Sequence, residues 1–513
     1  MFPIVLLSIL VAQAYGARIL AVVPTPSLSH QVVFRPLTQE LARRGHEVVI
    51  ITPDPVFTNN NAPANLTEID VREVSYEVWR KNFLSNKEIG KKGDLVLTSA
   101  LFLEQFRKVL EMQLQTDDVK RIIRGERGNF DLLILEAAMR PALVFSHIFK
   151  VPVIQVSSCG AMLNSNSIVG APSHPFLYPW MLNQRLYNLT MWEKIQELVN
   201  RLTIESFYAE CETLEEEMLR RVVDPDMPSL HELSNNVDLI FYNSHPIWSD
   251  KQPVPPNVVY VGGIHKNPKK ELPQDLKSYL DSSKNGVIYI SFGNNIKPSL
   301  LPVEKVQMLA RIFSELPQNV LWRWDVDIAN KSANVKITQW VPQSDMLRHP
   351  NIKLFIMQGG LQSTEEAIDA GVPLIGIPMI ADQWYNVEKY TYFGIGKRLD
   401  MGSSTEDEFR EAIKTVLEDK SYRENVMKLR KLLQDQPESA LERAVWWTEY
   451  VLRHGGAKHL RSPAANMHWT EYYEIKLLLT FLAVLLIAGS ILYSALFYVF
   501  RILNRISGKV KLA

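Results

Sequence analysis

Cysteine is nearly missing from this chain, which has two thiols, Cys159 and Cys211, among 513 residues. This scarcity excludes a disulfide-dense scaffold and leaves open one bridge, although two ordinary thiols are favoured. The chain also has no excess charge of either sign, because 56 basic residues are matched by 56 acidic residues. The balance argues against nucleic acid or another polyanion as a partner. The sequence shows no internal repeat with a fixed short period and no low-complexity segment.

The chain is long for one domain, and its length suits two domains. Short β-branched runs such as Ile19–Val23 alternate with helical stretches up to about residue 160, and the alternation restarts at Gly286–Ser291. Alternation of this kind predicts parallel sheets with helices on both faces, an α/β fold with two doubly wound domains. The Pro-rich segment Pro246–Pro256 suits an interdomain linker. The predicted domains are therefore residues 17–245 and 246–455.

Both ends of the chain carry long apolar runs. Residues 1–16 have an apolar core followed by Ala14-Tyr15-Gly16, which is typical of a cleaved signal peptide. Residues 477–500 contain no charged side chain, and as a helix they would extend roughly 36 Å, enough to cross a membrane. A stem is predicted at 456–476.

The flanks of residues 477–500 predict an orientation. Two acidic residues precede this span, whereas basic residues follow it in the tail 501–513, so the tail is expected in the cytosol and the body in the lumen. Lys509 and Lys511 resemble a dilysine signal that retains type I proteins in the endoplasmic reticulum membrane. In a lumenal body the sequons at Asn65, Asn188 and Asn330 become candidate glycosylation sites, and their occupancy is left open.

The most informative segment lies between residues 340 and 386. It contains Trp340-Val-Pro-Gln343, then Gln358-Gly359-Gly360-Leu-Gln-Ser363-Thr-Glu-Glu366, and then Asp382-Gln383. An indole can stack on a base, and a Gly-Gly turn before a helix brings backbone amides to a diphosphate. Carboxylate and amide side chains suit the hydroxyls of a sugar. Together these residues suit the binding of a nucleotide sugar.

This segment resembles the nucleotide-sugar signature of the UDP-glycosyltransferase family, and the likeness extends over residues 18 to 505. The resemblance implies the GT-B architecture, in which two Rossmann-like domains face each other across a cleft. It also implies that the C-terminal domain binds a UDP-sugar as co-substrate, without a separate cofactor. The residues to which it assigns donor contacts are Gly293, Asn294, Arg323, Trp340, Gln343, Gln358, Gly359, Gly360, Ser363, Glu366, Asp382 and Gln383.

Within that set the resemblance gives individual roles. Trp340 would stack on uracil, Gln343 would contact the uridine, and Glu366 would hold the ribose hydroxyls. Asp382 and Gln383 would form hydrogen bonds with the hydroxyls of the sugar. Gln358 stands where the family usually has His, so a neutral amide replaces a potential cation, a feature that resembles the insect branch of the family.

The N-terminal domain is expected to hold the acceptor and the base. The resemblance implies that His30 deprotonates the acceptor hydroxyl, a role that suits an imidazole. Its orienting carboxylate would be Glu136, in Phe130-Asp-Leu-Leu-Ile-Leu-Glu136, where the family usually has Asp. Asp325 and Asp327 mimic a metal-binding pair, but no metal is expected, because helix termini can neutralise a diphosphate.

Aromatic residues are frequent in the insertions 54–125 and 160–235. Most are expected to pack in a core, and some to line an apolar acceptor pocket. The residues concerned are Trp79, Phe83, Phe102, Phe106, Phe176, Tyr178, Trp180 and Trp192.

The sequence therefore predicts an inverting, metal-independent UDP-glycosyltransferase that transfers a hexose, with glucose favoured over glucuronate, to a small lipophilic acceptor. Membrane attachment through one span is expected, and a homo-oligomer is compatible with the sequence. The alternative is a catalytically silent receptor or carrier with a two-lobed lumenal body. The joint presence of His30, Glu136, Glu366 and the Asp382-Gln383 pair favours the enzyme.

Overall fold

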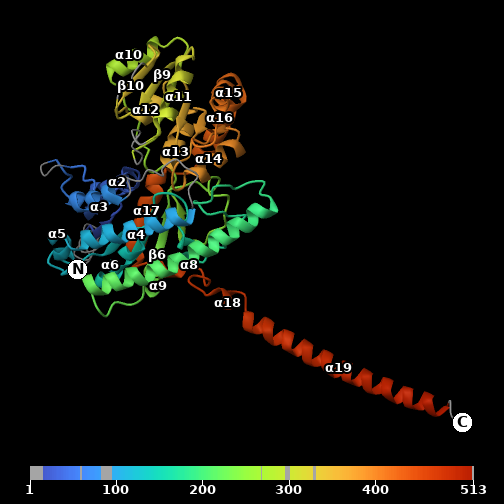
Figure 1. Ribbon diagram of the computed structural model, residues 1–513. Coiled ribbons are helices and arrows are strands. Elements are labelled where there is room, and N and C mark those ends of the chain that lie inside the picture. The colour runs from blue at the N-terminus through green and yellow to red at the C-terminus, as the bar shows by residue number, and fades with distance from the viewer. Residues whose placement is uncertain are drawn as a thin grey trace.

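The computed structural model describes residues 16–57, 61–82, 95–266, 268–294, 301–326, 328 and 331–510. Two parallel sheets form two lobes, and a long helix leaves the body at its C-terminal end (Figure 1). The predictions that fall on residues 1–15, Phe83, Asp327, Asn330 and Lys511 lie outside these described residues. The prediction of two doubly wound α/β domains is confirmed.

The N-terminal lobe is built on a seven-stranded sheet of order β3-β2-β1-β4-β5-β6-β7, in which every strand pairing is parallel. Strands such as β4 and β5 are buried along their whole length, as expected of a parallel sheet covered on both faces. The strands are β1 (Arg18–Val22), β2 (Glu47–Thr52), β3 (Leu66–Asp70), β4 (Leu132–Glu136), β5 (Val153–Ser157), β6 (Val237–Tyr242) and β7 (Val258–Tyr260). The helices are α2 (Leu28–Arg43), α3 (Arg72–Asn82), α4 (Leu95–Leu114), α5 (Asp117–Ile123), α6 (Val144–Phe149), α7 (Ser165–Val169), α8 (Met191–Val222) and α9 (Leu230–Leu233).

The C-terminal lobe has a six-stranded parallel sheet of order β10-β9-β8-β11-β12-β13. Its strands are β8 (Val287–Ser291), β9 (Asn319–Arg323), β10 (Val335–Thr338), β11 (Ile352–Met357), β12 (Leu374–Gly376) and β13 (Gly396–Arg398). Its helices are α10 (Gln274–Ser282), α11 (Val303–Ser314), α12 (Gln343–Leu347), α13 (Leu361–Ala370), α14 (Gln383–Tyr392), α15 (Glu406–Glu418) and α16 (Lys420–Gln434).

The predicted linker at Pro246–Pro256 is wrong. This segment joins β6 to β7, and both strands belong to the first sheet. The N-terminal lobe therefore extends to Tyr260, beyond the predicted boundary at 245. Proline marks an irregular connection but does not reveal which strands it joins, and β7 has only three residues, too few for a recognisable pattern.

The last helix of the body also crosses between the lobes. Helix α17 (Ala440–His454) follows the C-terminal lobe in sequence but packs on α2 of the N-terminal lobe. Its buried residues Ala444, Val445 and Val451 share a core with Val33 and Phe34 of α2. The domain predicted as 246–455 thus contributes its final helix to the other lobe.

Beyond α17 the chain runs through α18 (Trp469–Tyr472) into α19 (Ile475–Val510), which contains the predicted span 477–500. Residues Ile475–Ile506 are long and apolar enough to cross a membrane, and none of the most apolar part is buried. The helix continues into the basic tail as far as Val510.

Candidate active site

His30 lies at the carboxyl edge of the first sheet, in the first turn of α2. Strand β4 pairs with β1 in parallel and ends at Glu136, so both side chains reach the same edge. Glu136 is fully buried, and its Oε1 contacts Nδ1 of His30. The longer side chain of Glu136, compared with the Asp usual in the family, reaches the imidazole.

The contact between Glu136 and His30 sets the tautomer of the imidazole. A carboxylate oxygen accepts, so Nδ1 carries the hydrogen and Nε2 keeps its lone pair for a proton. The second oxygen, Oε2, accepts from the backbone N–H of Thr25 at 3.0 Å. The hydroxyl of Ser158 lies 3.3 Å from the same Nδ1. His30 is therefore held in one orientation with Nε2 available as a base.

The turn between β11 and α13 is built around glycine. Gly359 has a φ of +94°, and a Cβ there would lie 2.4 Å from a methyl group of Val387. Gly293, which follows β8, has a φ of +75°, and a Cβ there would lie 2.2 Å from Nε2 of Gln358. The amide of Gln358 therefore rests directly on the backbone of Gly293. The N-terminal residues of α13, Gly360 and Leu361, line the adjacent cavity, where backbone amides can receive an anion.

Gln343 joins two other predicted donor residues, Ser363 and Glu366, into one polar cluster. Its Nε2 donates to Oγ of Ser363 at 3.0 Å and to Oε2 of Glu366 at 2.7 Å. The hydroxyl of Tyr289 donates to Oε1 of Gln343 at 3.2 Å, which fixes the amide orientation. Burial raises the pKa of Glu366. The cluster offers carboxylate and hydroxyl oxygens on the wall of one cavity.

Asp382 and Gln383 lie where β12 has ended and α14 begins. Oε1 of Gln383 accepts from the backbone N–H groups of Met379 and Ile380, both at 2.9 Å, so its amide hydrogens remain for the cavity. Oδ2 of Asp382 accepts from Nδ2 of Asn386 at 2.8 Å. Burial raises the pKa of Asp382 to about 6.

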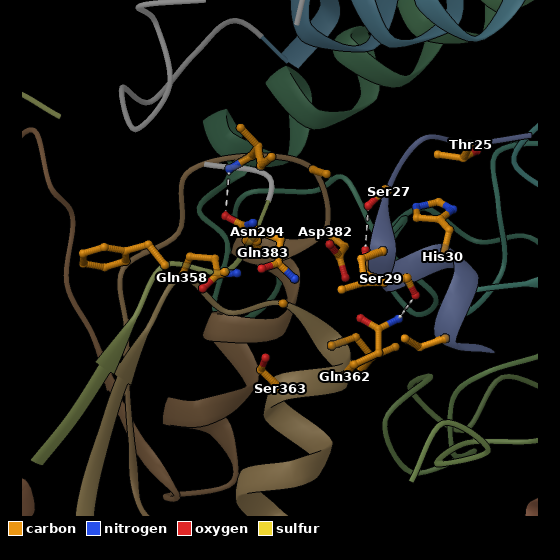
Figure 2. Close-up of a pocket in the computed structure, with 18 of the residues that line it drawn as sticks. Thr25, Ser27, Ser29, His30, Asn294, Gln358, Gln362, Ser363, Asp382 and Gln383 are labelled. Atoms are coloured by element: carbon orange, nitrogen blue, oxygen red, sulfur yellow. Dashed lines mark hydrogen bonds between the residues drawn. The ribbon is translucent and has the colours of Figure 1, made fainter. Parts of the chain in front are cut away.

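A cavity of about 260 Å³ between the lobes brings most of the predicted residues together (Figure 2). His30 lines it from the N-terminal lobe. The predicted donor residues that line it are Gly293, Asn294, Gln343, Gln358, Gly360, Ser363, Glu366, Asp382 and Gln383. One cavity therefore holds both the expected base and the expected donor contacts.

Four predicted residues lie behind or beside this wall. Trp340 is 68% exposed on the surface. Arg323 donates to Oδ1 of Asn294 at 2.5 Å and to the carbonyl of Gln339, so it orients a wall residue. Glu136 and Gly359 support the wall from behind, through His30 and the turn.

The sequence motif predicted no role for Gln362, although this residue is next to Ser363. Its Nε2 donates to the carbonyls of Ser158 at 2.9 Å and Ser29 at 3.3 Å, both in the N-terminal lobe. Figure 2 shows Gln362 directly beside Ser29. Its place in the first turn of α13 was the available signal.

Asn386 was also missed, and it holds the donor side in place. Its Nδ2 donates to Asp382 and to the carbonyl of Gly359, at 2.8 and 2.9 Å. Its Oδ1 accepts from Nε1 of Trp248, in the N-terminal lobe, at 2.9 Å. Asn386 follows the Asp382-Gln383 pair by one helical turn, which was the signal in the sequence.

A second, more apolar cavity of about 150 Å³ adjoins His30 and Asp382 and is lined mostly by residues of the N-terminal lobe. Its apolar wall consists of Phe102, Leu103, Phe106, Met162, Leu163, Met181 and Leu182. Phe106 stacks on the buried Trp79, with ring centroids 6.1 Å apart. Such a wall suits an apolar acceptor beside the base.

The aromatic predictions have mixed outcomes. Phe102 and Phe106 line the apolar cavity, and Trp79 is buried beside them. Trp192 is 65% exposed, so the expectation that it lies in a core or pocket is wrong. Helical spacing identifies a face of α8 but does not say whether that face is covered. Cys159 and Cys211 are both free and buried, which confirms two ordinary thiols.

Comparison with known proteins agrees with this geometry. The family model for UDP-glucoronosyl and UDP-glucosyl transferase matches residues 18–510. An ecdysteroid UDP-glucosyltransferase of Spodoptera littoralis nuclear polyhedrosis virus is 34% identical over 486 residues, covering 91% of this chain and 94% of that protein. UDP-glucosyltransferase 2 of Dactylopius coccus is 30% identical over 503 residues, covering 93% of this chain and 92% of the relative.

Solved structures agree on the fold. The spinosyn forosaminyltransferase SpnP superposes with a TM-score of 0.57 at 17% identity, covering 85% of this chain and 100% of that chain. The likeness confirms the predicted GT-B architecture. The chain belongs to the UDP-glucoronosyl and UDP-glucosyl transferase family, and it is a UDP-glycosyltransferase. This assignment excludes the silent receptor or carrier.

Proposed function

We propose that this enzyme transfers glucose from UDP-glucose, with inversion, to a hydroxyl of a small lipophilic acceptor. The observation that supports this proposal most directly is the pairing of His30 with the buried Glu136. His30 lines the same cavity as the residues expected to bind the donor. The relatives named as UDP-glucosyltransferases support glucose as the sugar. The viral relatives named as ecdysteroid enzymes support a lipophilic alcohol as the acceptor.

The geometry supports a single displacement. The acceptor hydroxyl gives its proton to Nε2 of His30 as its oxygen bonds to the anomeric carbon. Glu136 stabilises the imidazolium that forms. The bond from the anomeric carbon to the phosphate oxygen breaks, and UDP leaves with the electron pair. Gln358, Ser363 and the N-terminal amides of α13 receive the charge that accumulates on the departing diphosphate.

The test is a matrix of UDP-sugars against phenols, steroids and alcohols, with UDP release as the measure. UDP-glucose with a lipophilic alcohol is expected to give the highest turnover. The product should be a β-glucoside by NMR, since inversion converts the α-linkage of UDP-glucose. His30→Ala is the control that should abolish transfer and leave UDP binding nearly unchanged. An α-glucoside, or activity confined to UDP-glucuronate, would contradict the proposal.

Metal independence is part of the same proposal. The diphosphate charge is met by helix N-terminal amides and hydrogen-bond donors, so a chelator should leave turnover unchanged. Loss of activity with EDTA and recovery with manganese would require a metal at the diphosphate.

We further propose that α19 anchors the protein in the endoplasmic reticulum membrane, with the body in the lumen. Asn65 and Asn188 are both exposed and would then be open to glycosylation. Replacing both Lys509 and Lys511 by Ser should release the protein to later secretory compartments without changing turnover. A reticular location that persists in the double variant would show that another feature retains the protein.

A further inference from the structure

The apolar cavity beside His30 contains two polar side chains that the protein itself leaves without a partner. Asn164 and Tyr208 both line this cavity. Neither side chain forms a hydrogen bond with any residue that the structure describes. By contrast, Ser158 in the same cavity contacts His30, and Gln362 donates to two backbone carbonyls. The side chains of Asn164 and Tyr208 are therefore available to a ligand.

Tyr208, on α8, is held in place by a buried arginine. Cζ of Arg140 lies 3.8 Å from the centroid of the Tyr208 ring, and Nη2 of Arg140 donates to the backbone carbonyl of Tyr208 at 3.1 Å. Arg140 is only 5% exposed, and it donates to Glu215 and Glu212 at 2.7 and 2.6 Å. Burial raises the pKa of the Tyr208 hydroxyl, so this group keeps its proton at neutral pH. The hydroxyl is therefore a donor on a ring whose position is fixed.

Asn164 immediately precedes α7, at a position where an asparagine side chain usually accepts from a backbone N–H of the first helical turn. Here the side chain forms no such bond, and the backbone of Asn164 is near-helical rather than extended, with a φ of −104° and a ψ of −4°. The residue is partly buried. Its amide consequently keeps both a donor and an acceptor for the cavity.

The rest of the cavity wall makes these two groups informative. The wall is mostly apolar and includes the rings of Phe102 and Phe106. Ligand pockets of this kind use a small number of polar groups to select and orient the ligand. An acceptor with a single hydroxyl, placed at His30, would cover Asn164 and Tyr208 with apolar surface and separate them from water. Because buried polar groups without a partner weaken binding, the cavity favours an acceptor that brings a second oxygen.

We propose that Asn164 and Tyr208 bind a second oxygen function of the acceptor, so that the enzyme prefers a lipophilic diol or hydroxyketone to a simple alcohol or phenol. This inference rests on the function proposed above, because it takes His30 as the group that activates the first hydroxyl. Tyr208 donates to the second oxygen, while the amide of Asn164 donates to a ketone or accepts from a hydroxyl. Contact at two points holds the reacting hydroxyl against His30.

The test compares acceptors that share one rigid skeleton and differ by one oxygen. The probes are androstanol, which has one hydroxyl, androstanediol, and hydroxyandrostanone. The kcat/KM of the full chain is measured for each probe from UDP release at saturating UDP-glucose. Tyr208→Phe removes only the hydroxyl and keeps the ring on Arg140, and Asn164→Leu replaces the amide by an apolar group of similar size. Tyr473→Phe, at an exposed position in the stem, is the matched control for loss of a tyrosine hydroxyl.

The unsubstituted enzyme should favour both two-oxygen probes over androstanol by about tenfold or more in kcat/KM. Tyr208→Phe should lower this ratio by about tenfold, Asn164→Leu should lower it severalfold, and Tyr473→Phe should leave it unchanged. A global loss of fold would lower turnover for every probe, whereas loss of the second contact changes the ratio between probes. Calorimetric binding of UDP shows independently that each variant is folded.

The outcomes separate this inference from the proposed function. Transfer to all three probes with equal kcat/KM would overturn the second contact and leave the glucosyltransferase function intact. A preference for two oxygens that persists in both Tyr208→Phe and Asn164→Leu would also overturn the assignment of these residues. Absence of transfer to every probe would contradict the proposed function, and the second contact with it.

A binding measurement removes the chemical step from the comparison. Androstanone has a ketone but no hydroxyl to glycosylate, so it should inhibit competitively against androstanediol with its ketone on Tyr208. Its inhibition constant should rise about tenfold in Tyr208→Phe and stay unchanged in Tyr473→Phe. An inhibition constant that is the same in the unsubstituted enzyme, Tyr208→Phe and Asn164→Leu would overturn the proposed contact.

Discussion

The substitution Glu136→Gln tests the orientation of the base most directly. The carboxylate accepts from His30 through Oε1 and from the backbone of Thr25 through Oε2. Glutamine has the same shape but one acceptor and one donor, so it cannot satisfy both partners. If its oxygen faces Thr25, its NH₂ forces Nδ1 to accept, and the hydrogen moves to Nε2, where it blocks base catalysis.

The expected loss follows from this conflict. An amide in place of a carboxylate that orients a catalytic imidazole can lower turnover by about 10⁴. Some of the population can keep the productive tautomer by turning the amide oxygen toward His30, with Thr25 then unpaired. We therefore expect kcat to fall by roughly 10²–10⁴, or about 3–5 kcal/mol in activation free energy. The lost acceptor should lower the free energy of unfolding by about 1–3 kcal/mol.

The assay is the initial rate of UDP release at saturating UDP-glucose, with calorimetry for UDP binding. UDP affinity should be unchanged, since Glu136 lies on the lobe opposite the expected uridine site. Glu136→Asp is the matched control, because it keeps a carboxylate and should recover part of the lost rate. A Glu136→Gln enzyme with more than a tenth of the original kcat would refute the orienting role.

Three further predictions concern the donor. Trp340→Ala should raise the KM for UDP-glucose by about 5-fold to 150-fold if the exposed indole stacks on uracil, worth about 1–3 kcal/mol; an unchanged KM would place Trp340 outside the site. Gln358→Ala should lower kcat by a loss of about 1–3 kcal/mol at the departing diphosphate, whereas Gln358→His replaces one donor by another and should change it only modestly; wild-type kinetics in the alanine variant would remove Gln358 from the site. The pKa of Asp382 is raised to about 6, so its carboxylate is protonated below that pH. Calorimetry should show UDP-glucose binding weakening below about pH 6, while UDP binding and the Asp382→Asn variant show no such step; a step of equal size in the variant would exclude Asp382 as its origin.

Much of this site could be predicted because its parts are local in sequence. Gln358, Gly359, Gly360 and Ser363 follow one strand and open one helix, so spacing alone places them together. The contact of His30 with Glu136 spans 106 positions, and the family resemblance predicted it. Both residues lie at the same edge of the first sheet.

The inter-lobe contacts could not be predicted in this way. Gln362 reaches carbonyls of Ser29 and Ser158, and backbone carbonyls carry no signature in the sequence. The exposure of Trp192 depends on whether another surface covers α8, which its own spacing does not encode. The lobe boundary was misplaced for a related reason, since β7 is recognised by its pairing with β6 rather than by its composition.

The relative placement of the lobes depends on polar contacts that also position the donor residues. Lys389 of α14 is buried and pairs with Asp250 of the N-terminal lobe at 2.8 Å. Burial lowers the pKa of Lys389 to about 8, so the partner is needed to keep its charge. A buried ion pair adds little stability relative to apolar packing, but it penalises any arrangement that separates its members. Because α14 also begins beside Asp382 and carries Asn386, the helix that fixes the lobes also fixes the residues expected to read the sugar. Helix α14 therefore links the lobe contact to the position of these residues, and sliding of one lobe past the other would separate Lys389 from Asp250.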